Sequence, residues 1–123
     1  MVQERSISNG AAEIDPVVME FVREKVNSFI RWDLVRFFHD NPHTANTADN
    51  IARYIGREAE PVQAELVGLA SANVLAVKTV SQRSIFSLST DAAIRDIVHR
   101  FAIACDDPQF RVKAIHQVLG VNN

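Results

Sequence analysis

The most specific structural signal in this chain is the stretch Thr47-Ala48-Asp49-Asn50-Ile51-Ala52-Arg53-Tyr54-Ile55-Gly56. The hydroxyl of Thr47 can accept a hydrogen bond from a backbone N–H of the following turn, as helix N-caps do. Ile51, Ala52 and Ile55 recur at helical spacing and form an apolar inner face. Gly56 readily adopts the left-handed conformation that ends many helices. The stretch therefore predicts a short helix that begins after Thr47 and ends at Ile55.

A second helix is predicted directly after this one, over residues 61–72. Pro61 suits the first position of a helix. Asn73 can adopt the left-handed conformation that ends it. Between them, the predicted buried stripe consists of Val62, Leu66, Leu69 and Ala70.

The apolar period then changes from helical to alternating. Leu75, Val77 and Val80 predict a strand, and residues 84–88 predict its partner. The intervening turn is expected at residues 81–83, although it contains no glycine.

Helical patterns flank this central region on both sides. Asp15 and Pro16 predict a helix start, and the apolar period continues to residue 40 as one long helix or as two helices broken near residues 27–28. Asp91 caps a further predicted helix, and the sequence around Pro108 starts a last one. We expect residues 1–14 to form a flexible tail and residues 15–123 to form one winged-helix domain with a C-terminal helical extension.

The complete order is helix, short helix, tight turn, helix, two-stranded ribbon and helix. Over residues 29–89 it resembles bacterial winged helix-turn-helix regulators. The resemblance implies a mostly α fold with a small β-hairpin, or wing, and flanking N- and C-terminal helices. It also implies that the helix over residues 61–72 enters the major groove of DNA. The implied function is a non-catalytic, DNA-binding transcriptional regulator.

Composition describes an ordinary globular domain. The 123 residues include 13 Lys and Arg against 15 Asp and Glu, for a net charge of -2, and 47% of the residues are hydrophobic. The first dozen residues contain no apolar signal-peptide region, and the longest mostly apolar run, residues 67–77, is too short to cross a bilayer. We expect a cytoplasmic protein.

The distribution of charge both supports and opposes DNA binding. Residues 57–72 hold one basic and three acidic side chains, whereas residues 73–89 hold two basic and no acidic ones. Carboxylates repel phosphates, so the acidic helix is a departure from the usual pattern. The candidate DNA-binding residues are Arg57, Lys78 and Arg83 for the phosphates, and Gln63 and Ser71 for the bases.

Two alternatives involve partners other than DNA. The small apolar face at Ala64, Val67 and Gly68 suits either a protein partner or the domain's own C-terminal helix, so the alternative function is a protein–protein interaction module that does not bind DNA. A homodimer is also expected, because long flanking helices need a partner to cover them. The candidate dimer-interface residues are Trp32, Ile94, Ile97, Val98 and Phe101. A regulator with an effector pocket between the dimer helices is a third hypothesis.

Catalytic and metal-binding motifs are not found in the sequence. There is no glycine-rich phosphate loop and no nucleophile elbow, so we expect neither an enzyme nor a cofactor. His39 and His43 lie close together, but Asn41-Pro42 breaks the helix that would align them, so no metal site is predicted. Cys105 belongs to an apolar stripe and is interpreted as a small buried hydrophobic residue.

Overall fold

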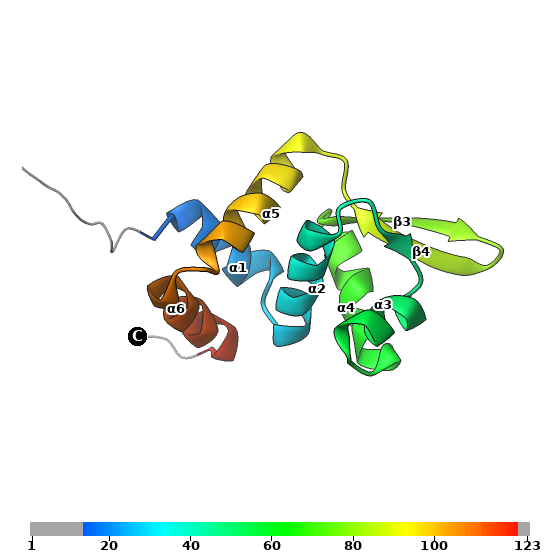
Figure 1. Ribbon diagram of the computed structural model, residues 1–123, viewed down its shortest axis with the longest axis horizontal. Coiled ribbons are helices and arrows are strands. Elements are labelled where there is room, and N and C mark those ends of the chain that lie inside the picture. The colour runs from blue at the N-terminus through cyan, green and yellow to red at the C-terminus, as the bar shows by residue number, and fades with distance from the viewer. Residues whose placement is uncertain (1–13, 121–123) are drawn as a thin grey trace, which may run out of the picture.

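The computed structural model describes residues 14–120 and is mostly α-helical with a small antiparallel sheet (Figure 1). The sheet has three strands in the order β2-β4-β3. The elements run in the order α1 (Pro16–Lys25), α2 (Phe29–Asp40), β2 (Ala45–Asn46), α3 (Ala48–Ile55), α4 (Ala59–Ser71), β3 (Leu75–Val80), β4 (Arg83–Leu88), α5 (Ala92–Ala104) and α6 (Pro108–Leu119). This order is compatible with the winged-helix expectation. All of the predicted N-terminal tail except Ile14 lies outside the described residues.

The first long helical pattern is divided into two helices. Ser28 has extended backbone, and its hydroxyl accepts a hydrogen bond of 3.1 Å from the N–H of Arg31 at the start of α2. The two-helix alternative is therefore the correct one, because a capping side chain at this position starts a new helix.

Helix α3 has the bounds that its sequence predicts, whereas α4 begins earlier than predicted. The Thr47 hydroxyl accepts from the N–H of Asn50 at 3.4 Å, and Gly56 ends α3 with a φ of 72°. Helix α4 starts at Ala59, two residues before the predicted start at Pro61. The first turn of a helix leaves its N–H groups unpaired, so a proline is accommodated within that turn and need not open it.

The sheet contains one strand that the sequence pattern does not predict. β2 has only two residues and pairs with β4, with Ala45 opposite Ser87 and Asn46 opposite Phe86. β3 and β4 form the expected hairpin, in register from Leu75 opposite Leu88 to Val80 opposite Arg83. Its turn consists of Ser81 and Gln82 alone, with φ of 50° and 67°, so the expected three-residue turn was one residue too long.

At Gly56 the backbone conformation, and not a lack of space, disfavours other residues. No atom lies within 4 Å of a Cβ built there, but its φ of 72° is strained for any residue with a Cβ. Gly56→Ala should therefore lower the free energy of unfolding by about 1–2 kcal/mol, measured by urea denaturation. Gly56→Asn should cost less, since asparagine tolerates this conformation. An alanine variant as stable as the parent would contradict the interpretation.

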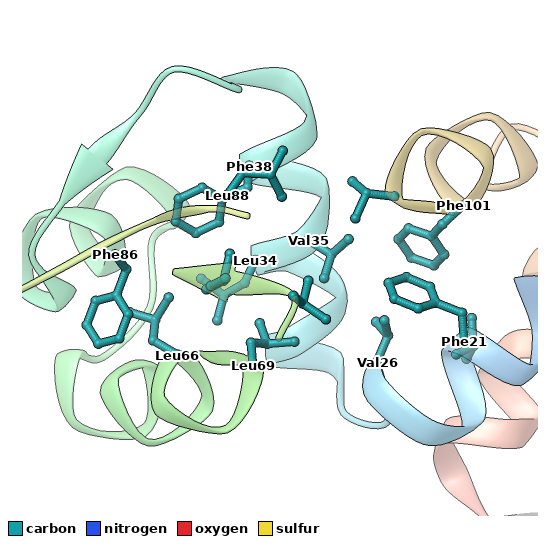
Figure 2. Close-up of a cluster of buried hydrophobic side chains, with 14 of the residues drawn as sticks. Phe21, Val26, Leu34, Val35, Phe38, Leu66, Leu69, Phe86, Leu88 and Phe101 are labelled. Carbon is teal, nitrogen blue, oxygen red and sulfur yellow. The ribbon is translucent and has the colours of Figure 1, made fainter. Parts of the chain in front are cut away.

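The hydrophobic core is arranged around α2. Leu34, Val35 and Phe38 are fully buried. Figure 2 shows α2 between two groups of side chains, one with Phe86 from β4 and one with Phe101 from α5. The core is therefore continuous from the sheet to the C-terminal helices.

An aromatic cluster joins the C-terminal helices to the N-terminal ones. The ring of Phe101 lies 6.0 Å from Phe21, 5.1 Å from Trp32 and 6.3 Å from Phe110, all in edge-to-face arrangements. Such pairs contribute beyond the burial of their area. Helices α1, α2, α5 and α6 therefore form one packed unit. No helix among residues 14–120 has the length and apolarity needed to cross a membrane.

Candidate nucleic-acid interface

A polar pocket lies where α3, α4 and the β3–β4 hairpin meet. It has a volume of about 270 Å³ and opens to solvent. Each of the three elements contributes polar side chains to its wall, which is lined by Thr47, Asp49, Gln63, Gln82, Arg83 and Ser84. We call this region the hairpin pocket. Two of the predicted DNA-binding residues, Gln63 and Arg83, meet there.

Lys78 and Arg83 project from the same face of the hairpin. Arg83 stands directly opposite Val80, and Lys78 is two residues from Val80 on the same strand. Cross-strand partners and residues two apart share one face of a sheet. Both cations are exposed, and neither has a carboxylate partner within the described residues. The hairpin therefore presents two positive charges side by side.

Arg57 does not belong with these two cations. Its Nε lies 2.8 Å from Oδ2 of Asp33 on α2, and it lines a different pocket together with Trp32 and Arg111. The structure thus separates Arg57 from the hairpin cations with which the sequence grouped it. Asp33 lies 24 positions before Arg57, so no local pattern reveals this ion pair.

The negative charge of Glu65 on α4 is compensated by an ion pair with Arg31. The Nε of Arg31 lies 2.6 Å from Oε1 of Glu65, and their side chains are 19% and 28% exposed. The guanidinium of Arg31 rests against Gly68, where a Cβ would collide with it. Arg31 was not among the predicted residues, and the only sequence signal for it is a glycine inside a helix. As a result, Glu58 and Glu60 are the acidic side chains of α4 and its N-cap that stay exposed without an ion-pair partner in the described part of the chain.

The two predicted base readers are not brought together. Gln63 lines the hairpin pocket, whereas Ser71 is exposed at the other end of α4, eight residues or about 12 Å along the helix. Between them lie Ala64 and Val67, of which Val67 is 49% exposed. The C-terminal helix does not cover this face, so the expectation that it packs there was wrong. The middle of the exposed face of α4, at Ala64 and Val67, is therefore small and apolar.

The predicted dimer residues pack within their own chain. Val98 and Phe101 are almost fully buried, and Trp32, Ile94 and Ile97 pack against the same core. Their apolar stripes are therefore covered by α1, α2 and α6 rather than left open. Among the exposed large apolar side chains of the described residues, Val112, Ile115 and Leu119 lie at helical spacing on α6.

Cys105 is buried, as its place on the apolar stripe predicts. Burial raises the pKa of its thiol above the usual value, and the nearby guanidinium of Arg36 offsets this only in part. A thiol of this kind is poorly nucleophilic at neutral pH. The residue is therefore part of the core.

The chain matches none of the protein-family models, curated proteins or solved structures with which it was compared.

Proposed function

We propose that this protein is a winged-helix, DNA-binding regulator without catalytic activity, in which the β3–β4 hairpin is the wing. The observation that carries the proposal is the placement of Lys78 and Arg83 on one face of the hairpin, with Arg83 also lining the hairpin pocket. Two adjacent cations on a projecting ribbon suit the phosphate backbone of a duplex. The proposal rests on this charge arrangement and on the order of the elements.

Gln63 would then read the major groove. It lies in the first half of α4, where the hairpin pocket brings it near Arg83. A glutamine amide offers both a donor and an acceptor and can pair with the edge of adenine. Arg83 would hold the backbone while Gln63 reaches a base.

The charge of α4 limits the affinity. The ion pair with Arg31 compensates Glu65, but Glu58 and Glu60 stay exposed at the start of the helix. Carboxylates at that position repel a phosphate backbone. We therefore expect weak and strongly salt-dependent binding.

A homodimer belongs to the proposal, with its interface moved from the predicted residues to α6. Val112, Ile115 and Leu119 are exposed at helical spacing on this helix. Single exposed apolar residues are ordinary, but a stripe of them suits a second copy. A dimer would also double the number of wing cations.

Titration of a labelled duplex tests the proposal. Fluorescence anisotropy should show binding at about 20 mM salt. A plot of the logarithm of the association constant against log[salt] should have a slope of about -2 for one chain or about -4 for a dimer, because each contacted phosphate contributes about -0.9. Absence of binding at the lowest salt, or a slope near zero, would overturn it.

A second candidate is docking of a protein partner on α4. The exposed Ala64 and Val67, with the acidic Glu60 at one end, favour an apolar and basic partner helix over DNA. The same titration separates the two candidates, because this one predicts no binding of the duplex at any salt concentration.

A further inference from the structure

Two histidines from distant parts of the chain meet on the surface between α2 and α5. His39 Nε2 lies 3.0 Å from His99 Nδ1, and the two rings are stacked with centroids 5.2 Å apart. The pair is separated by 60 residues in sequence. The spacing of His39 and His43 alone had predicted no metal site, but His99 supplies a nitrogen that no local pattern could place.

The two backbones that carry these rings are held by the core. Phe38, next to His39, and Val98, next to His99, are both buried, and α2 packs against α5. The rings themselves reach solvent, with the side chain of His39 27% exposed. The pair is therefore positioned by the fold and accessible to an ion from solution.

Asp40 fixes which nitrogen of His39 is free. Its Oδ1 lies 3.0 Å from Nδ1 of His39. A carboxylate only accepts hydrogen bonds, so Nδ1 carries the proton and Nε2 of the neutral ring carries the lone pair. Metal-bound histidines commonly have this arrangement, in which a carboxylate orients the ring from behind.

We propose that His39 and His99 form a two-point site for a divalent transition-metal ion of the Ni²⁺ or Cu²⁺ type. Two nitrogens at about 2.1 Å from one ion are about 3.0 Å apart when the angle at the ion is roughly 90°. This angle belongs to tetragonal and octahedral coordination, and imidazole nitrogen suits these ions.

Binding requires a lone pair on both nitrogens and small rotations of the two rings toward the ion. Because Nε2 of His39 carries a lone pair, Nδ1 of His99 is the donor of the 3.0 Å contact in the free protein. On metal binding this proton would move to Nε2 of His99 through solvent, so no net proton is released. Since the described residues hold no group of three or more His, Cys, Asp or Glu side chains suited to one ion, water would complete the coordination.

Calorimetric titration of the tag-free full chain with NiCl₂ tests the site, with MgCl₂ as the control ion. We expect saturable binding of one Ni²⁺ per chain and none of Mg²⁺, which prefers oxygen ligands. His39→Gln and His99→Gln should each weaken binding at least about ten-fold, because the second contact of a linked pair is lost. Asp40→Ala should weaken it by about ten-fold through loss of orientation.

His43 and His116 provide matched controls, since both are exposed histidines of the same chain. His43→Gln and His116→Gln should leave Ni²⁺ binding unchanged, and circular dichroism should show all variants folded. The site is overturned if the parent binds no Ni²⁺, or if either control weakens binding as much as His39→Gln does.

Discussion

Phe101→Ala should lower the free energy of unfolding by about 3–5 kcal/mol, the usual cost of deleting a fully buried phenylalanine. Phe101 is 0% exposed and contacts the rings of Phe21, Trp32 and Phe110. These residues come from α1, α2 and α6, so the substitution leaves a cavity where four helices meet. Urea denaturation followed by circular dichroism measures the effect.

Ile103→Ala is the matched control for this prediction. Ile103 lies on the same helix and is 58% exposed, so its truncation should change stability by no more than about 0.5 kcal/mol. Two results would indicate that α5 and α6 fold separately from the rest of the chain. One is a loss of less than about 1 kcal/mol of unfolding free energy in Phe101→Ala, and the other is unfolding of the parent in two steps. Either outcome contradicts a single continuous core.

Reversing both wing charges, Lys78→Glu with Arg83→Glu, should weaken duplex binding by about two orders of magnitude at low salt. The double variant changes the wing charge by four units, and each unit near a phosphate contributes on the order of 0.5–1 kcal/mol in water. Both side chains are exposed, so the fold should be unaffected. Anisotropy titration at fixed salt measures the change.

Glu58→Gln with Glu60→Gln is the opposite charge change on the neighbouring helix. It should raise affinity several-fold, since two repulsive carboxylates become neutral. For the Lys78→Glu, Arg83→Glu variant, an affinity equal to that of the parent would show that the hairpin does not contact DNA, even if the parent binds.

The elements that could be predicted from the sequence are those determined by local chemistry. Thr47 and Gly56 bracket α3 by a cap and a left-handed terminus, and Asp15, Asp91 and Asp107 cap their helices in the same way. The alternation of apolar and polar residues over the hairpin predicts the two long strands. Strand β2 is too short to have any alternation, so only its pairing with β4 reveals it.

The features that could not be predicted depend on contacts between distant residues. Glu65 looked like an obstacle to DNA until the structure placed Arg31 beside it, 34 residues away in sequence. Arg57 looked like a free cation until the structure placed Asp33 beside it. Phe101 looked like a dimer residue because a single apolar stripe does not indicate whether its partner lies in the same chain. In each case the sequence shows the residue but not the distant residue that pairs with it.

We expect the wing and the hairpin pocket to form the DNA-contacting surface. A two-dimensional ¹⁵N NMR titration with a short duplex at low salt tests it residue by residue. The perturbed amides should cluster at Gln63, Lys78 and Arg83 and along residues 81–84, with α5 and α6 unchanged unless the dimer forms. Perturbations centred on Ala64 and Val67 without the wing, or no perturbations at all, would contradict it.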